Sequence, residues 1–243
     1  MNFKVNRNIF MNLIKSYGLT NKERKEFLKI TYKLFRHKEF QRRMTKEFSH
    51  HNDITLGEHS IEVALSTYLD SKKKQLKGIN VNIDVSVKIA ILHDMYELPW
   101  QNNKESSSKC LFHKHGFRHP IEAAINAIYY YPDLFKDDKE ALMIIDGIIH
   151  HMYPLAVPSI STFNKNEVEL KNFEKTKYIE ERLLNYIIYS TNRGRLGKLS
   201  ICMSKFIEGK IVCISDTKVS ISNFEKLKGV TALVTGVNKN IEA

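Results

Sequence analysis

The spacing of apolar residues along this chain predicts a protein built from helices. Apolar positions recur at intervals of three and four over most of the sequence, which is the period of an amphipathic helix. Thr20 and Glu23 have the spacing of a capping box and open a helix with a basic face. Further helices are predicted over 57–74, from Asp84 to before Pro99, from Pro120 onward, and from Asp137 or Asp138 to the break at 152–154.

The second half of the chain is more polar before it returns to an apolar helix. A charged helix is predicted from Val168 to Tyr189, followed by a link rich in Gly, Asn and Arg over 190–197. The last strong helix is predicted from Leu199 to Ser222, where Gly209 could interrupt it, and the Val- and Thr-rich tail over 229–237 as a short strand. We expect an all-α fold, a helical bundle in a single domain over 1–243. An N-terminal helical extension is expected over 1–50, and a helical insertion over 159–197 before the last core helix.

The composition is that of a globular protein without a membrane segment. Of the 243 residues, 42% are hydrophobic and 27% are charged, a balance that can bury a core. The three cysteines are odd in number and widely spaced, which argues against a disulfide scaffold and favours a reducing compartment. No apolar run approaches the ~18 residues of a membrane helix, and residues 1–10 lack the apolar segment of a leader. We expect a cytoplasmic protein with no membrane partner.

A formal net charge of +11 favours an anionic partner without choosing among nucleotides, nucleic acids and acidic surfaces. The segment from Lys22 to Lys46 is strongly basic and contains the aromatic residues Phe35 and Phe40. One hypothesis is therefore a face that binds nucleic acid. The alternative is a solvated basic surface, since helical spacing puts Phe35 among the core-facing residues.

Histidines and aspartates stand at the ends of helices that are otherwise apolar. His59 lies in the first turn of one predicted helix, His93 and Asp94 end a second, and Asp216 lies in an apolar stretch of the last. Burying such groups without partners costs ~2–7 kcal/mol each, so we expect them to satisfy one another. A divalent metal ion satisfies imidazoles and carboxylates together, with Mn, Mg, Fe, Ni, Co and Zn as the candidate ions.

Five short fragments carry these residues in a fixed order. They are EHSIEVA (58–64), LHD (92–94), HGFRHPIEAAINA (115–127), HMYPL (151–155) and IVCISD (211–216). Together they resemble the HD superfamily of metal-dependent phosphohydrolases, and the third, fourth and fifth are similar to an uncharacterised firmicute subgroup of it. The resemblance covers roughly 51–155 and 210–222.

The resemblance implies a metal centre and a reaction. It implies that one ion is held by His59, His93, Asp94 and Asp216. It further implies that Asp94 bridges to a second ion held by His119 and His151. Two ions ~3.5–4 Å apart generate a hydroxide nucleophile and neutralise charge on a phosphoryl group. We therefore expect hydrolysis of a small anionic phosphomonoester or phosphodiester, nucleotide-like in character, at a centre in which Asp94 is essential.

Basic side chains beside the ligands are candidates for holding the phosphate. Arg118 precedes His119, and Lys218 follows Asp216 by two positions. On a helix a residue two positions along points elsewhere, which weakens the case for Lys218. Each of the two could instead be a solvated charge. His51 and His115 are candidates to donate to leaving-group oxygens, or else loop histidines that face water.

Two features depart from the subgroup. His151 and Asp216 are 65 positions apart, a longer separation than is usual there, and Lys218 does not stand directly beside the aspartate. Two alternatives to an enzyme remain, namely a module of the same fold that binds nucleic acid and one that senses a ligand without turnover. The sequence leaves open the substrate, the number of ions and the oligomeric state.

Overall fold

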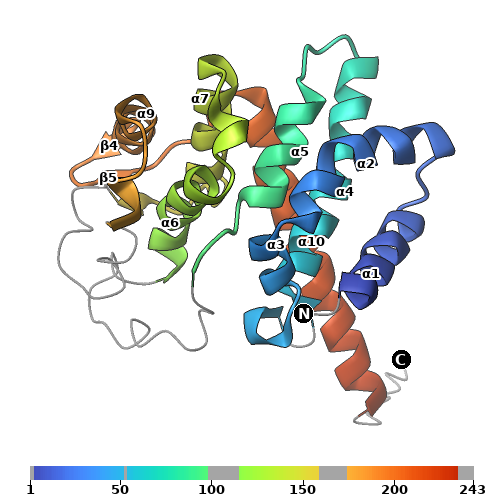
Figure 1. Cartoon of the computed structure of the whole chain (residues 1–243). Helices are drawn as coiled ribbons and strands as arrows, with labels where there is room; N and C mark the ends of the chain where they lie inside the picture. Colours follow the sequence, from blue (N-terminus) through green and yellow to red (C-terminus); the bar gives the residue numbers. More distant parts are fainter. Residues whose placement is uncertain (1–2, 52–53, 98–114, 159–173, 235–243) are drawn as a thin grey trace.

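The computed structural model describes residues 3–51, 54–97, 115–158 and 174–234 (Figure 1). Most of these residues are helical and the strands are short, which confirms the predicted all-α class. The principal helices are α1 (Phe3–Ser16), α2 (Asn21–Arg36), α3 (Lys38–Arg43), α4 (Leu56–Leu76), α5 (Ile83–Leu92), α6 (His115–Tyr130), α7 (Asp138–Ile149), α9 (Glu181–Asn192) and α10 (Ile207–Val234). No helix in the described part of the chain combines the length and apolar character that crossing a bilayer requires.

The N-terminal helices share the main hydrophobic core. At the start of α2 the predicted capping box is present, because Thr20 Oγ1 accepts from the N–H of Glu23 at 3.3 Å and the Glu23 carboxylate accepts from the N–H of Thr20 at 2.9 Å. The rings of Phe10 in α1 and Phe35 in α2 stack with centroids 4.2 Å apart. Both belong to the buried cluster that contains Ile89 of α5. The N-terminal segment is thus packed onto the rest of the bundle.

Helix α5 occupies the middle of the molecule (Figure 1) and packs against α4, α7 and α10. It is apolar on most sides, as a helix surrounded by other helices must be. Its N-cap is Asn82, whose side chain accepts from the N–H of Val85 at 3.2 Å. The predicted cap, Asp84, lies instead in the first turn and pairs with Lys88 one turn later. Either acceptor satisfies a free N–H, so the sequence alone did not separate them.

Helices α6 and α7 carry the next two predicted segments. Helix α6 begins at His115, earlier than predicted, and Pro120 lies inside it. Helix α7 is capped by Asp137, whose side chain accepts from the N–H of Glu140 at 2.8 Å, and ends at Ile149 just before the predicted break. One of the two proposed caps was therefore correct.

The region before α10 differs most from the prediction. Helix α9 starts at Glu181, later than the expected charged helix, whose residues 168–173 lie outside the described part, as do 159–167 of the predicted insertion. Leu199 and Ser200 form β5 (Leu199–Ser200), the central strand of an antiparallel sheet with β3 (Val157–Pro158) and β4 (Arg195–Leu196). These two residues were predicted to be helical. They form a strand instead because β3, which is distant in the sequence, lies beside them and pairs with them.

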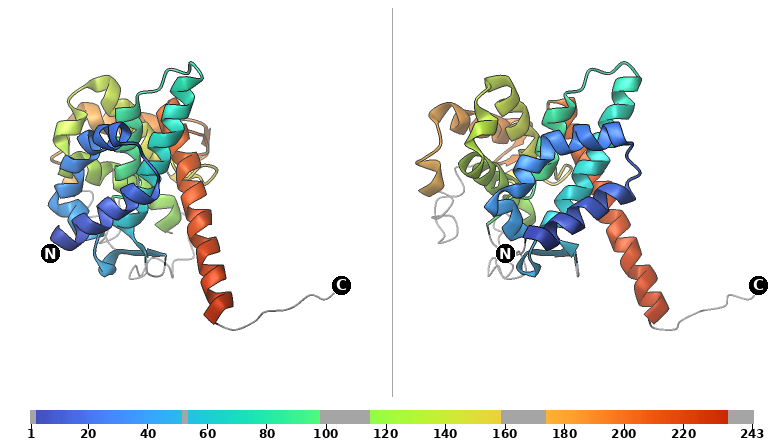
Figure 2. Two further views of the ribbon diagram at one scale, coloured as in Figure 1. Left: turned by 90° about the vertical axis from the view of Figure 1, so that its right-hand side faces the viewer. Right: turned by 45° about the vertical axis from the view of Figure 1, so that its right-hand side comes forward.

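Helix α10 runs without interruption through Gly209 to Val234, and its C-terminal turns project from the body (Figure 2). The predicted strand over 229–237 is therefore wrong as far as residue 234, and residues 235–237 lie outside the described part. Val and Thr favour strands only weakly, and here the helix continues through them.

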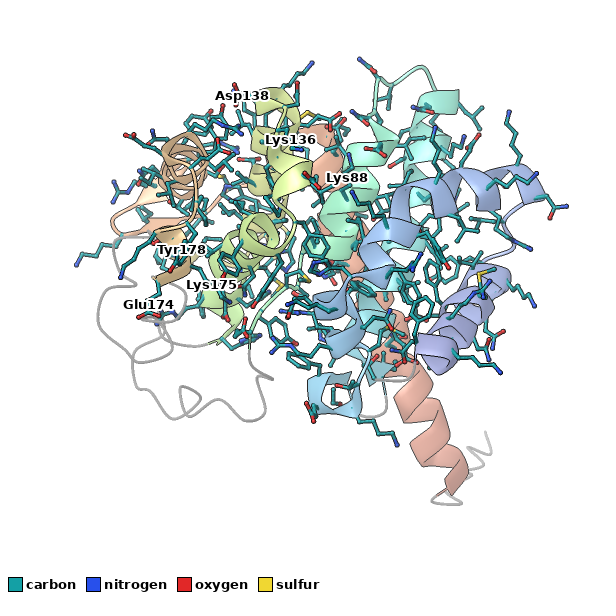
Figure 3. All side chains as sticks on the ribbon, in the orientation of Figure 1. Lys88, Lys136, Asp138, Glu174, Lys175 and Tyr178 are labelled. Atoms are coloured by element: carbon teal, nitrogen blue, oxygen red, sulfur yellow. The ribbon has the colours of Figure 1, made fainter. Side chains whose placement is uncertain are left out.

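Lys175 links the segment before α9 to the bundle, and Figure 3 shows it with Tyr178 beside α6. Its Nζ donates to Glu97 Oε2 at 2.6 Å and to Asn126 Oδ1 at 2.7 Å. Arg42 of α3 donates to the other Glu97 oxygen at 2.9 Å. The Glu97 carboxylate thus joins three segments that are far apart in the sequence.

Candidate metal centre

The six residues predicted as metal ligands meet in the core of the bundle. All are buried, with exposed fractions of 8% or less. They come from the first turn of α4, the ends of α5 and α7, and the interiors of α6 and α10. In that chain order they are His59, His93 with Asp94, His119, His151 and Asp216, with His151 following α7.

A second capping box positions His59. Thr55, in strand β2 (Ile54–Thr55), accepts from the N–H of Glu58 through its hydroxyl at 3.2 Å, and the Glu58 carboxylate accepts from the N–H of Thr55 at 2.8 Å. The start of α4 is therefore fixed at Leu56, three residues before His59. Strand β2 pairs with β1 (Ser49–His51) to form a short hairpin beside the site.

The carboxylate of Asp94 lies between two groups of imidazoles. Its Oδ2 is 3.4 Å from His93 Nε2 and 4.0 Å from His59 Nε2. Its Oδ1 is 3.3 Å from His119 Nε2 and 3.5 Å from His151 Nε2. The two oxygens of a single carboxylate thus face two different pairs of histidines.

Asp216 completes the first of these groups. Its Oδ1 accepts from His59 Nε2 at 3.0 Å and lies 3.7 Å from His93 Nε2. In the second group, the Nε2 atoms of His119 and His151 are 3.0 Å apart. The six side chains therefore form two adjoining sets of donors that share Asp94.

Backbone carbonyls orient three of the four imidazoles. The Nδ1–H groups of His93, His119 and His151 donate to the carbonyls of Ala90 at 2.7 Å, His115 at 3.0 Å and Ile148 at 2.7 Å. Each acceptor lies three or four residues earlier in the chain, so the local helical backbone orients the ring. With its proton on Nδ1, each ring directs the lone pair of Nε2 toward the cluster. This is the usual arrangement of a metal-ligating histidine.

The cluster strongly favours ionised carboxylates. Burial alone would raise the pKa of Asp94 and Asp216, but the surrounding histidines outweigh burial and hold both pKa values below the usual range. Burial would lower the pKa of His93, but the charges of Asp94 and Asp216 raise it to about 9. Burial lowers the pKa of His151. The two carboxylates thus attract positive charge to this part of the core.

The donor set fits a metal ion. His93 Nε2 is buried and has no hydrogen-bond partner among the described residues, an arrangement that is costly when left uncompensated. The Nε2 atoms of His119 and His151 meet at 3.0 Å although both rings use Nδ1–H elsewhere, so two lone pairs converge unless a cation or proton lies between them. These buried groups could therefore hold a metal ion, and the set His59, His93 and Asp216 has ligand atoms within 4.8 Å of one another.

The sequence did not single out His50, which belongs to the same neighbourhood. It lies in β1, its ring stacks on that of His59 with centroids 4.0 Å apart, and it forms a further possible ligand set with His59 and Asp94. The side chain of its neighbour His51, which the sequence did single out, lies outside the described part. No helical periodicity marks His50, because the hairpin rather than a helix brings it to the site.

A cavity of about 210 Å³ opens onto the cluster. His115 lines it and stacks on His119 with ring centroids 4.8 Å apart, and burial lowers the pKa of His115 to about 3, with the nearby His119 adding to the effect. His115 is therefore neutral at pH 7. The lining residues are His50, Asp94, Tyr96, His115, Gly116, His119, Met152, Asp216 and Ser220.

The two predicted phosphate-binding residues are not part of this lining. Arg118 is buried, with 6% of its surface exposed, and it is engaged with other groups of the protein. Lys218 donates to Asp70 on α4 at 2.6 Å and lines a different cavity. The structure therefore does not bring Lys218 to the cluster. Two residues along a helix correspond to about 200° of rotation, so Lys218 points away from the face that carries Asp216.

Comparisons with models of protein families, with curated proteins and with solved structures find no match to this chain. The fold is compatible with that of an HD protein in being a helical bundle with a buried cluster of histidine and aspartate. The assignment of a family and a reaction is therefore a proposal.

Proposed function

We propose that this protein is a metal-dependent phosphohydrolase of the HD superfamily that cleaves a small phosphomonoester or phosphodiester of nucleotide type. The observation that carries the proposal is the position of Asp94, whose oxygens lie 3.4 Å from His93 on one side and 3.3 Å from His119 on the other. A carboxylate between two sets of imidazoles can bridge a pair of cations, one through each oxygen.

Each ion would have its own set of ligands. His59, His93, Asp94 and Asp216 would hold the first, and Asp94, His119 and His151 the second. Four imidazoles and two carboxylates with no thiolate suit Mn, Fe, Co, Ni or Zn better than Mg. When bound, such ions lower the pKa of water and neutralise charge that develops on a phosphoryl group.

The cavity supports a phosphorylated substrate only if cations are bound. Asp94 and Asp216 both line it, and both favour the ionised form. Two carboxylates would repel an incoming phosphate, so substrate binding should depend on metal. His115, neutral and at the wall, can donate a hydrogen bond to a phosphate oxygen.

Metal analysis followed by a hydrolysis screen tests the proposal. The purified protein should contain divalent metal and hydrolyse members of a panel of nucleotides and phosphodiesters supplied with Mn, Mg, Fe, Ni or Co. Asp94→Asn should lose both metal and hydrolysis, whereas Asp133→Asn, a change at an exposed residue paired with Lys136, should lose neither. A full metal complement in Asp94→Asn would contradict the ligand assignment. Bound metal without turnover of any substrate would favour a ligand-sensing module.

The nucleic-acid alternative has weaker support. Arg43 is 1% exposed and donates to the backbone carbonyls of residues 95 and 96, and Arg42 pairs with Glu97. Phe35 and Phe40 are buried in the core, so they offer no face on which a base could stack. Part of the basic segment therefore serves to hold the N-terminal helices in place. Salt-dependent retention on polynucleotide would support the alternative.

A further inference from the structure

A second and larger cavity, of about 340 Å³, lies between the C-terminal half of α4 and the first half of α10. Its lining contains four lysines, one aspartate and three isoleucines. Small-molecule sites have volumes of ~300–1,000 Å³, so this cavity is large enough for a ligand of moderate size. We call it the lysine cavity.

The lysine cavity is separate from the histidine and aspartate cluster. From α10 it takes Ile211, Ile214 and Lys218, which follow one another at helical spacing on one face. Asp216 and Ser220 lie on another face of the same helix and line the cavity at the cluster. The two faces of α10 thus serve two different cavities, and a ligand of one would not touch the other.

Positive charge in the lysine cavity exceeds negative charge. Asp70 accepts from Lys218 at 2.6 Å and lies 3.6 Å from the Nζ of Lys73, so one carboxylate serves two ammonium groups. Lys74 and Lys77 have no ion pair among the residues that the structure describes. Lysines near a helix C-terminus also compensate its dipole. That effect does not require the lysines to surround a cavity.

The floor of the lysine cavity is apolar. Ile79 and Ile214 are 40% and 43% exposed, and Ile211 is buried. Covering exposed isoleucine surface releases water and favours binding. A ligand that fits therefore carries at least two negative charges for Lys74 and Lys77 and an apolar ring for the isoleucines.

We propose that the lysine cavity binds a nucleoside polyphosphate, with the phosphates on Lys74 and Lys77 and the base over Ile79 and Ile214. This site is additional to the proposed substrate site and does not depend on metal. The charge of the cavity selects the phosphates, and its isoleucines distinguish a nucleotide from a simple polyanion.

Calorimetric titration with ATP tests the proposal on full-length protein stripped of divalent ions by a chelating resin, so that metal-dependent binding at the cluster does not contribute. We expect saturable binding of one ATP, weakened about tenfold or more in Lys74→Gln/Lys77→Gln because two charge-assisted contacts are lost. Lys25→Gln/Lys29→Gln, which removes the same charge from exposed positions of α2, should bind as the original protein does. Ile214→Ser should weaken binding of ATP but not of tripolyphosphate.

Three results would overturn the proposal. They are the absence of saturable ATP binding in the original protein, equal losses in the two lysine double variants, and tripolyphosphate binding as tight as that of ATP with no effect of Ile214→Ser. Capture of polynucleotide by these lysines without ATP binding would equally reject a nucleotide site. Circular dichroism melts of each variant separate loss of binding from loss of folding, since all the substituted side chains are at least partly exposed.

Discussion

Two adjacent histidines at the end of α7 point to different parts of the molecule. His151 Nε2 lies 3.5 Å from Asp94 in the cluster. His150 Nε2 donates to the backbone carbonyl of Ser190 in α9 at 3.1 Å, and the ring lies near the buried carboxylate of Asp146 at 3.7 Å. Burial lowers the pKa of His150. His150 therefore connects α7 to α9, and His151 belongs to the candidate metal centre.

Single substitutions of the two histidines should show which of them binds metal and which only stabilises the fold. His151→Ala should lower the metal content of the purified protein. His150→Ala should keep the metal but lower stability by about 1–3 kcal/mol, because a buried carbonyl loses its donor. Elemental analysis and thermal melts of metal-free protein provide the two readouts. Equal loss of metal in both variants would contradict the division of roles.

At the residue scale most of the candidate site could be predicted from the sequence. The six proposed ligands stand in recognisable fragments, and the structure brings all six together. His50 could not be found, because it reaches the cluster through a hairpin whose pairing is not encoded by a helical period. The position of Lys218 could have been rejected from helix geometry alone.

At the scale of elements, α7 and α10 approach one another closely at two glycines. A Cβ added to Gly209 of α10 would lie 2.7 Å from the Cα of Gly147 in α7, and it would also collide with the hydroxyl of Ser204. That hydroxyl donates to Asp146 at 2.8 Å. The sequence suggested that Gly209 could interrupt the helix, whereas its role is to let two helices approach one another.

Gly209→Ala should therefore destabilise the protein. Alanine is the better helix former by ~1 kcal/mol, but the collision with a backbone atom cannot be relieved by rotating a side chain. We expect a net loss of about 1–3 kcal/mol in the free energy of unfolding. Gly116→Ala in α6 is the matched control, since a Cβ there meets no atom within 4 Å, and it should be neutral or slightly stabilising. Urea denaturation measures the free energy of unfolding of both variants. An unchanged value for Gly209→Ala would show that the two helices can move apart at little cost.

Across the whole molecule, Glu97 joins the N-terminal helices to the segment before α9. Burial would raise its pKa, but Lys175, followed by Arg42, outweighs burial and lowers the pKa to about 2. Tyr130 of α6 also donates to it, at 3.1 Å. Because an unfolded glutamate titrates at ~4.3, the native state keeps the charge in a range where the unfolded chain takes up a proton.

The contribution of Glu97 should disappear in acid. It is fully present above about pH 5, and it falls as the pH drops toward about 2, where the native carboxylate is also protonated. Glu97→Gln should be less stable than the original protein at neutral pH, and the difference should shrink as the pH is lowered through this window. Glu181→Gln, at an exposed position of α9, should show no such pH-dependent difference. Urea denaturation at several pH values measures the difference in unfolding free energy between Glu97→Gln and the original protein. A difference that stays constant with pH would refute the role of Glu97.

The sequence by itself determined the helical class, the capping box at Thr20 and the fragments that carry the candidate histidines and aspartates. These features are local, because a cap or a helical stripe is set by residues within a few positions of one another. Only the tertiary structure decided that His50 joins the cluster, that Leu199 and Ser200 pair as a strand, and that four lysines surround a cavity. Each of these depends on how distant segments pack, and the spacing of residues along one segment does not specify the position of another.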